Sequence, residues 1–216
     1  MANKGTLYDG FAATAQSLAS GRRVELLDVL AQGERPVEEL AQSVGLTVAN
    51  CSQHLQVLLR AGLVARRREG NRIWYRLTSD AVVDLLGLLR EVAYDRSAEV
   101  KEAAEAYLGG PVEAIDRAQL VDRLQRGDVV VLDVRPRREF EAGHLPGAVS
   151  IPIDELEARL NELPEDVEVV AYCRGRFCAF ADQAIRILET AGRRALRLDE
   201  GLPEWRQAGL PVEAAS

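Results

Sequence analysis

Apolar residues recur every three or four positions through the first half of the chain, as they do on the buried faces of amphipathic helices. The pattern predicts five helices, over residues 9–20, 22–31, 36–44, 48–61 and 80–107. Thr47 is the expected N-cap of the fourth helix, and Gly45 and Gly62 are expected to end the third and the fourth. The last helix is longer and more apolar than a small domain can bury alone, which predicts a partner subunit over it.

Between residues 63 and 77 the apolar period changes from that of a helix to that of a strand. Ile73, Tyr75 and Leu77 alternate with other residues, as the side chains of one half-buried strand do. The segment 69–71, which reads Glu-Gly-Asn, is a turn sequence. The two arms on either side of this turn therefore predict a β-hairpin.

The second half alternates continuous apolar runs with helical segments. The runs at 128–134 and 167–172 predict central parallel strands, which are buried on both faces, and residues 195–198 predict a third strand. Helices are predicted over residues 118–125, 154–160 and 179–191. The Gly-Gly-Pro segment at 109–111 cannot easily continue a helix. We therefore predict two domains, residues 1–108 and 109–216.

The composition fits folded domains and excludes a disordered chain: of 216 residues, 47% are hydrophobic and 28% are charged. The amino-terminal segment lacks the charged and apolar regions of a secretory signal, and no stretch approaches the roughly 18 apolar residues of a membrane span. Three cysteines, Cys51, Cys173 and Cys178, are too few and odd in number for a disulfide framework. We expect a cytoplasmic protein with no membrane association.

The net charge of −7 is unevenly distributed along the chain. Residues 1–108 hold 13 Lys and Arg against 14 Asp and Glu, whereas residues 109–216 hold 14 against 20. Within residues 47–77, six arginines stand against the single acid Glu69. A local basic excess of this kind permits DNA binding by a protein that is acidic overall.

Two helices joined by a glycine-containing turn and followed by a basic hairpin predict a winged helix-turn-helix, with residues 48–61 as the recognition helix. The polar side of that helix offers groups for base edges or phosphates: Asn50, Ser52, Gln53, His54, Gln56 and Arg60. The hairpin offers arginines for phosphates or the minor groove: Arg66, Arg67, Arg68, Arg72 and Arg76. Two alternatives stay open, namely a solvated wing that touches nothing and a helix-turn-helix that contacts protein.

This half resembles the ArsR family of bacterial repressors over roughly residues 9–107. The matching segments are VEELA at 37–41, SQHLQVL at 52–58, AGLV at 61–64 and GNRIWYRL at 70–77. The resemblance implies a homodimer joined through its terminal helices. Its two recognition helices would then lie about one turn of a double-stranded DNA operator apart.

Many members of that family sense metals through a Cys-x-Cys pair or through His and Asp pairs on the last helix, and neither arrangement is present here. Cys51 and His54 lie three positions apart in the recognition helix, but a stable site needs about four ligands. Cys51 falls on the apolar stripe, which predicts a small core residue. We therefore expect no metal and no other cofactor.

The apolar run at 167–172 leads straight into a short segment before the next predicted helix. The segment consists of Cys173, Arg174, Gly175, Arg176, Phe177 and Cys178. Loop N–H groups and the helix dipole stabilise a thiolate or persulfide in such a place, and Gly175 lets the loop curl so that its amides converge. The pattern predicts a nucleophilic Cys173. Arg135, Arg174 and Arg176 would make the loop positive enough for an anionic donor.

The second half resembles the rhodanese family over roughly residues 112–212. The matching segments are LDVR at 132–135, EF at 139–140, GHLPGA at 143–148, IP at 151–152, YCRG at 172–175, residues 198–205 and GLPV at 209–212. The resemblance implies a five-stranded parallel sheet and a cysteine that carries sulfane sulfur. By position, Cys173 is that carrier, residues 174–178 form its cradle, and Asp133 and Arg135 support the loop. The expected fold is thus a mainly-α winged helix-turn-helix domain followed by an α/β rhodanese-like domain.

Two positions depart from the rhodanese pattern. Many rhodaneses that use thiosulfate carry an arginine where this chain has Cys178, and the usual Gly-Gly before the final tryptophan is Glu200-Gly201 here. Cys178 either resolves a Cys173 persulfide or sulfenate into a disulfide, or packs under the loop at the start of the helix. Arsenate reductases and phosphatases share this fold, but their sites usually carry arginine at the position of Cys178.

The fusion predicts a transcriptional regulator whose DNA affinity responds to sulfur or oxidant chemistry at Cys173. The sulfur donor would be a small molecule such as thiosulfate or polysulfide. One alternative is a sulfurtransferase enzyme that its first domain merely localises or dimerises. Others are a thiol–disulfide switch of Cys173 and Cys178, an inactive rhodanese fold used for binding and, last, an arsenate reductase.

Overall fold

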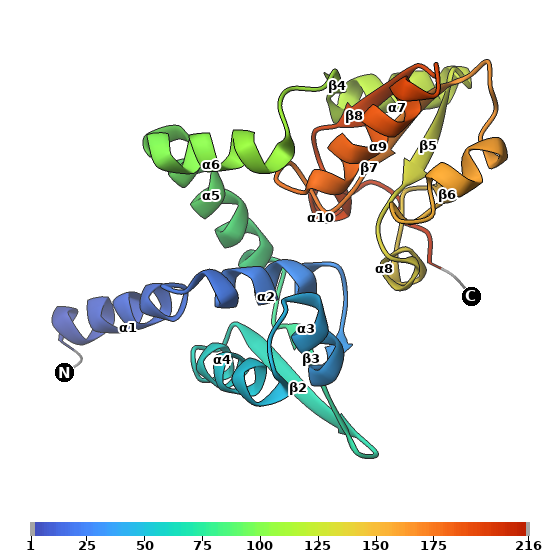
Figure 1. Cartoon of the computed structure of the whole chain (residues 1–216). Coiled ribbons are helices and arrows are strands. Elements are labelled where there is room, and N and C mark those ends of the chain that lie inside the picture. Colours follow the sequence, from blue (N-terminus) through green and yellow to red (C-terminus); the bar gives the residue numbers. More distant parts are fainter. Residues whose placement is uncertain (1–2, 215–216) are drawn as a thin grey trace. The chain divides into compact units, whose positions relative to one another are not determined.

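A computed structural model describes residues 3–214 of the chain (Figure 1). The chain divides into two compact units, Met1–Arg90 and Glu91–Ser216, and each is described by itself. This division falls inside a helix, and the domain boundary that we predict at 108/109 stays a prediction. Within residues 3–214, no helix is long and apolar enough to cross a membrane.

The first unit is a winged helix. Its elements in chain order are α1 (Lys4–Ser17), α2 (Gly21–Ala31), β1 (Arg35–Pro36), α3 (Val37–Ser43), α4 (Val48–Arg60), β2 (Val64–Glu69), β3 (Arg72–Leu77) and the first part of α5 (Ala81–Arg96). The three strands form an antiparallel sheet in the order β1-β3-β2. The hairpin of β2 and β3 turns at Gly70 and Asn71, as the sequence predicts.

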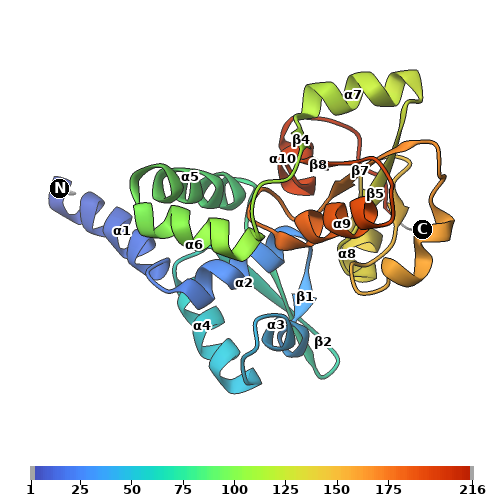
Figure 2. The same ribbon diagram turned by 45° about the horizontal axis from the view of Figure 1, so that its top comes forward.

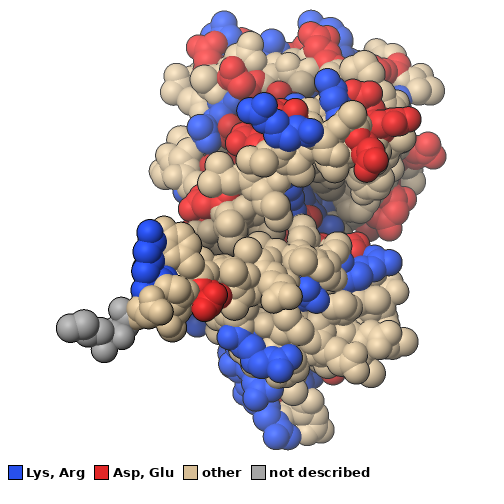
Figure 3. Space-filling view, turned by 90° about the vertical axis from the view of Figure 1, so that its left-hand side faces the viewer, with Lys and Arg blue, Asp and Glu red and all other residues tan. Residues whose placement is uncertain are grey.

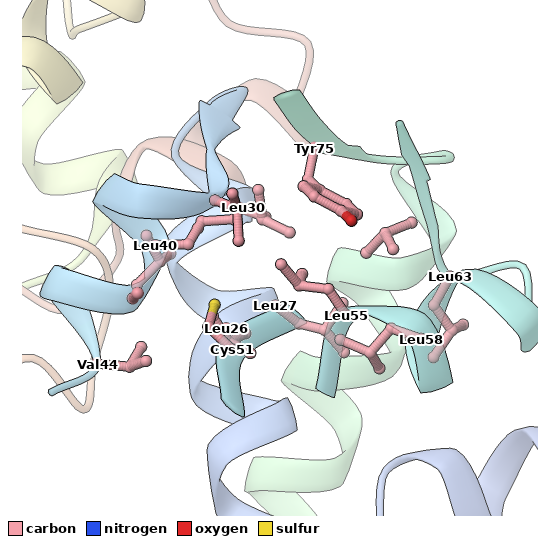
Figure 4. Close-up of a cluster of buried hydrophobic side chains, with 14 of the residues drawn as sticks. Leu26, Leu27, Leu30, Leu40, Val44, Cys51, Leu55, Leu58, Leu63 and Tyr75 are labelled. Carbon is pink, nitrogen blue, oxygen red and sulfur yellow. The ribbon is translucent and has the colours of Figure 1, made fainter. Parts of the chain in front are cut away.

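Helix α4 presents the apolar stripe that its sequence predicts. Cys51, Leu55 and Leu58 have no exposed surface, and Figure 4 shows them packed with Leu26 of α2 and Tyr75 of β3 in one cluster. The prediction that Cys51 is a core residue is confirmed. Burial raises the pKa of its thiol to about 11, so this cysteine stays protonated at neutral pH.

The N-terminus of α4 is also as predicted. The Thr47 side chain accepts a hydrogen bond from the backbone N–H of Asn50, at 3.3 Å. This bond satisfies one of the N–H groups that a helix start leaves without an intrahelical acceptor. The cap thereby fixes where the exposed side chains of the first turn point.

The prediction of one helix over residues 80–107 is wrong. Two helices cover this region, α5 and α6 (Ala98–Leu108), and Ser97 separates them with extended backbone angles. The Ser97 side chain accepts a hydrogen bond from the Val100 N–H at 3.3 Å, so it caps α6. A serine side chain can hydrogen-bond to nearby backbone groups, and such a bond can end one helix and start another. The periodicity of apolar residues contains no sign of this bond.

Two shorter predictions need smaller corrections. Pro36 lies in β1, where it pairs with Trp74, and its extended backbone angles make it the N-cap of α3, which begins one residue later. The helix predicted over 154–160 is a 3-10 helix, η1 (Glu157–Glu162), with a non-helical Arg159 inside it. Both segments are too short for periodicity to fix their conformation.

The second unit is an α/β fold. Its further elements are β4 (Ala114–Ile115), α7 (Arg117–Arg126), β5 (Val129–Asp133), α8 (Arg137–Ala142), β6 (Val149–Ser150), β7 (Glu168–Tyr172), α9 (Ala179–Thr190), β8 (Ala195–Leu198) and α10 (Leu202–Gln207). The strands pair in parallel in the order β4-β8-β7-β5-β6. The predicted five-stranded parallel sheet is confirmed.

Side chains of successive strand residues divide between two buried clusters, one on each face of this sheet. Figure 2 shows the helices α7, α9 and α10 that lie around the sheet. Val169 and Ala171 of β7 pack with residues of α9 and η1. Val170 and Tyr172, from the same strand, pack with residues of α7 and α10. The strands are therefore apolar at every position, which is why the sequence shows continuous runs rather than alternation. Because each of the four neighbouring strand pairs is parallel, the carboxyl ends of all five strands lie at the same edge of the sheet.

Leu55→Ala should lower the free energy of unfolding by about 2–5 kcal/mol, because a fully buried leucine leaves a cavity that the surrounding core fills only in part. Urea denaturation at a fixed protein concentration measures the change. Gln53→Ala, on the exposed side of the same helix, should change stability by no more than about 0.5 kcal/mol. Equal stability of the Leu55 variant and the wild type would contradict this description of the core.

Candidate functional site

The predicted DNA contacts on α4 spread over its whole length. Asn50 and Gln53 are exposed near its N-terminus, and Ser52, His54 and Gln56 are half-buried. Arg60 lies at the opposite end, where its Nε donates to the Gln56 carbonyl at 3.2 Å. It lines a cavity of about 490 Å³ together with residues of α1 and α2. The structure therefore groups the N-terminal polar residues and sets Arg60 apart from them.

The hairpin arginines are exposed and divide between two faces. The register pairs Arg67 with Trp74 and Glu69 with Arg72, so Arg67, Arg72 and Arg76 share one face. Arg66 and Arg68 point to the other face. In Figure 3, basic side chains gather on the projection that the hairpin forms at the bottom of Figure 1. Cations on both faces suit a wing that approaches a phosphate backbone.

Arg67 differs from the other wing arginines because its charge is already compensated. Its Nε lies 2.8 Å from Glu34, and its guanidinium also pairs with Glu69 and stacks over the Trp74 ring at 4.9 Å. The hydrogen bonds to Glu34 and Glu69 raise the pKa of this guanidinium above its usual value. Arg67 therefore fastens the hairpin to the segment before β1.

The second candidate site lies at the carboxyl end of β7. Cys173 follows the last residue of the strand and is 2% exposed, and α9 begins at Ala179. A disulfide joins Cys173 to Cys178, with the two Cα atoms 6.3 Å apart. The Cys178 N–H donates to the Gly175 carbonyl at 3.1 Å, which closes the loop between them. The structure thus places Cys173 and the five residues assigned to its cradle, 174–178, in one short loop between β7 and α9.

The arginines expected to make this loop positive have other partners. Arg135 is fully buried and donates to Asp133 at 2.6 Å and to the Gly143 carbonyl at 2.7 Å. Arg174 donates to Glu139, also fully buried, at 2.6 Å. Each guanidinium therefore neutralises a carboxylate within the fold.

Arg176 is exposed, and its guanidinium lies over an aromatic ring rather than over the cysteines. The ring belongs to Tyr94 of α5 and lies 4.9 Å away. The backbone carbonyl of Arg176 also accepts a hydrogen bond from Arg197 at 3.3 Å. The side chain and the carbonyl of Arg176 are therefore both engaged in contacts outside the cysteine pair.

Tyr172 connects the end of β7 to the buried charges. Its hydroxyl donates to the Asp133 carboxylate and accepts from the Leu145 N–H at 3.1 Å. Burial raises the pKa of Tyr172 well above its ordinary value, and the adjacent Asp133 charge adds to the effect. The phenol therefore keeps its proton. Burial opposes the charge of Arg135, but the hydrogen bonds to Asp133, together with the nearby charges of Asp133 and Glu139, hold the pKa of that guanidinium above its usual value.

Two glycines allow the loop to pack against the start of α10. Gly175 has a φ of 138°, a region that favours glycine. A Cβ on Gly201 would overlap the carbonyl group of Arg174 and would lie 2.6 Å from the Gly175 nitrogen. Gly201 stands in the segment where this chain keeps only one of the two glycines usual in rhodaneses.

Sequence reasoning missed three side chains at this site. Glu139 pairs with Arg174, Glu204 accepts the Gly201 N–H at 2.9 Å beside Gly175, and Tyr94 contacts the loop. Glu139 belongs to a segment that matches the rhodanese pattern, which signals its importance but not its partner. No sequence pattern indicates the contacts of Tyr94.

Comparisons with known proteins match both halves of the chain. The model of the family described as "Bacterial regulatory protein, arsR family" matches residues 20–66, and that described as "Rhodanese-like domain" matches residues 116–208. The chain is 49% identical over 210 residues to the HTH-type transcriptional regulator Rv0324 of Mycobacterium tuberculosis, which covers 97% of this chain and 93% of the relative. It is 34% identical over 104 residues to a sulfurtransferase of Allochromatium vinosum, covering 48% of this chain and 96% of that protein.

Among solved structures, the homodimeric winged helix-turn-helix DNA-binding domain Mb0332 of Mycobacterium bovis, a possible ArsR-family regulator, is 41% identical. It covers 46% of this chain and 95% of that chain, with a TM-score of 0.42.

Gly201→Ala should lower the free energy of unfolding by about 1–3 kcal/mol, because the added Cβ would meet backbone atoms that cannot move without displacing the loop. Chemical denaturation measures this. Gly21→Ala is the matched control: Gly21 is exposed in the first turn of α2 and its Cβ would meet nothing within 4 Å. The control should lose no stability and gain less than about 1 kcal/mol. Similar values for both variants would argue against the close approach at Gly201.

Proposed function

Because this chain belongs to the arsR family of bacterial regulatory proteins and carries a rhodanese-like domain after its winged helix, we propose that it is a sulfur-responsive transcriptional regulator. Cys173 accepts sulfane sulfur, and its chemical state sets the affinity of the winged helix for an operator. The observation that carries the proposal is the position of Cys173 at the end of β7, within bonding distance of Cys178.

The first chemical step is a transfer of one sulfur atom. The Cys173 thiolate attacks the outer sulfur of a persulfide donor, the donor's S–S bond breaks, and the donor thiolate leaves. Cys173 then carries the persulfide. Thiosulfate would react in the same way with sulfite as the leaving group. The loop offers thiosulfate little positive charge, because Arg174 already pairs with Glu139 and position 178 supplies no cation.

A second step converts the persulfide into the disulfide. The Cys178 thiolate attacks the Cys173 sulfur, the terminal sulfur leaves as hydrosulfide, and a bond between the two cysteines forms. No further oxidant is needed, because the persulfide already holds the oxidised sulfur. The observed Cys173–Cys178 disulfide supports this second candidate function, a thiol–disulfide switch, as an extension of the first.

The DNA-binding form is proposed to be a homodimer. Large apolar side chains are exposed on helices at both ends of the first unit, among them Leu7, Phe11 and Leu88, each more than half exposed. Exposed leucines and aromatics in such number mark a protein interface. A second copy that covers them would place two α4 helices on one DNA duplex, with the hairpins at the phosphates.

Intact mass of the reduced protein after brief exposure to polysulfide tests the sulfur step. The wild type should gain one sulfur atom or, after resolution, lose two hydrogens. Cys173→Ser should do neither. Cys178→Ser should gain the sulfur and keep it, because the attacking thiolate is absent. No change in the wild type would exclude sulfur acceptance at Cys173.

The regulatory step is tested with an operator selected by the reduced protein from a random pool of DNA duplexes. Polysulfide-treated wild type, verified by mass, should bind this duplex about 5-fold to 150-fold more weakly than the reduced form. Cys173→Ser should bind equally before and after treatment. Equal affinity of the reduced and modified wild-type forms would exclude regulation through this cysteine.

Arg72→Ala should weaken DNA binding and reduce the slope of log affinity against log salt concentration by about 0.9, the change expected for one lost phosphate contact. Arg67→Ala should leave that slope unchanged, because Glu34 and Glu69 already neutralise its charge. Fluorescence anisotropy at several salt concentrations measures both slopes. An unchanged slope for Arg72→Ala would remove this residue from the DNA contacts.

A further inference from the structure

The outer half of the cysteine loop rests on one aromatic side chain of α5. The Arg176 guanidinium lies 4.9 Å from the centre of the Tyr94 ring, and the Phe177 ring lies 5.5 Å from it. Lys101 of α6 approaches the same ring at 6.0 Å. Contacts of a cation or an aromatic ring with tyrosine at these separations are attractive. Tyr94 therefore contacts the two loop residues that precede Cys178.

The inner half of the loop is anchored differently. Arg174 is paired with the buried Glu139, and Gly175 packs against Gly201 without room for a side chain. These contacts hold the backbone beside Cys173 in place. A change in the bond between Cys173 and Cys178 will therefore be taken up mainly by residues 176 and 177, whose side chains contact Tyr94.

Helix α5 carries Tyr94 on an uninterrupted stretch of residues that also belongs to the winged helix. Val82 and Leu86, in its first turns, are buried in the core of the first unit. Arg90 pairs with Asp28 of α2 at 2.7 Å. Val82, Leu86, Arg90 and Tyr94 follow one another at intervals of four, which places them along one side of the helix. A shift of Tyr94 thus acts on the helix that packs in the DNA-binding unit.

We propose that Tyr94 is the positioning residue through which the state of Cys173 and Cys178 reaches the DNA-binding unit, an inference that rests on the proposed function. With the disulfide formed, Arg176 and Phe177 lie on the Tyr94 ring. Reduction takes up two electrons and two protons and replaces a covalent bond with a non-bonded contact, so the two sulfur atoms must separate. Phe177 and Arg176 then leave the ring, and α5 loses contacts that it has in the disulfide form alone. A ligand or bond shifts an equilibrium only through such differential contacts.

The test compares operator affinity of the disulfide and dithiol forms. Diamide makes the disulfide by accepting two electrons and two protons from the cysteine pair, and dithiothreitol restores the thiols; mass verifies each form. Cys51 does not interfere, because it is buried and its thiol has a pKa of about 11. In the wild type the two forms should differ by about 5-fold to 150-fold in affinity.

In Tyr94→Ala and Tyr94→Leu this ratio should fall to within about 2-fold of one, whereas disulfide formation by mass should stay complete. Tyr94→Phe should keep the wild-type ratio, because the ring and not the hydroxyl makes the contacts. Tyr107→Ala is the matched control, since Tyr107 lies on α6 and is 64% exposed. It should also keep the ratio. Tyr94→Leu keeps an apolar, helix-forming side chain and serves if the alanine variant unfolds.

The outcomes separate two failures. A wild-type ratio of one, with the disulfide verified, would overturn the proposed thiol–disulfide switch and this inference with it. A wild-type ratio well above one that persists in Tyr94→Ala and Tyr94→Leu would leave regulation by the cysteines intact and overturn the role of Tyr94. Loss of the ratio in Tyr107→Ala as well would show a general effect of truncating tyrosines in this region and would also overturn it.

Discussion

A guanidinium with no exposed surface is stable only if carboxylates and carbonyls accept its hydrogen bonds, and Arg135 meets this condition at the carboxyl edge of the sheet. Asp133 and the Gly143 carbonyl accept from it, and Tyr172 donates to the same carboxylate. These bonds tie β5, β7 and the segment after α8 to one another. Because Tyr172 immediately precedes Cys173, the position of the Cys173 sulfur depends on this buried pair.

The requirement that a buried charge has a partner also determines which cations of the cysteine loop are already paired. Glu139 is buried and needs a cation, and Arg174 supplies it, so that arginine is unavailable to a donor anion. Under the proposed function, the groups that remain for an anion at Cys173 are the N–H groups at the start of α9, which the helix holds in place. In the first unit, Glu34 and Glu69 restrain Arg67 in the same manner.

Much of the fold can be predicted from the sequence, because apolar residues repeat every three or four positions in the helices of the first unit and form continuous runs in the strands of the second. The apolar stripe of α4 predicts a helix with one buried face, and the continuous apolar runs of β5 and β7 predict strands buried on both faces. The break at Ser97 is not readable, since it depends on one side-chain hydrogen bond inside an unbroken apolar pattern. The sequence shows that Cys173 and Cys178 lie in one short segment between a strand and a helix. It does not show that Arg174 pairs with Glu139, which lies 35 residues away in the chain, because many other acidic residues carry the same charge. Nothing in the sequence distinguishes Tyr94 from other tyrosines in helices, because its contacts with Arg176 and Phe177 depend on the tertiary structure.

The burial of Cys51 has a consequence for the selectivity of the signal. A cell contains many electrophiles and oxidants, and each reacts fastest with accessible thiolates. Since the thiol in the recognition helix is both enclosed and protonated, such reagents have no direct route to the DNA-reading element. Under the proposed function, detection at Cys173 and Cys178 is therefore chemically separate from the recognition helix, and reagents that attack accessible thiolates leave the thiol of that helix unchanged.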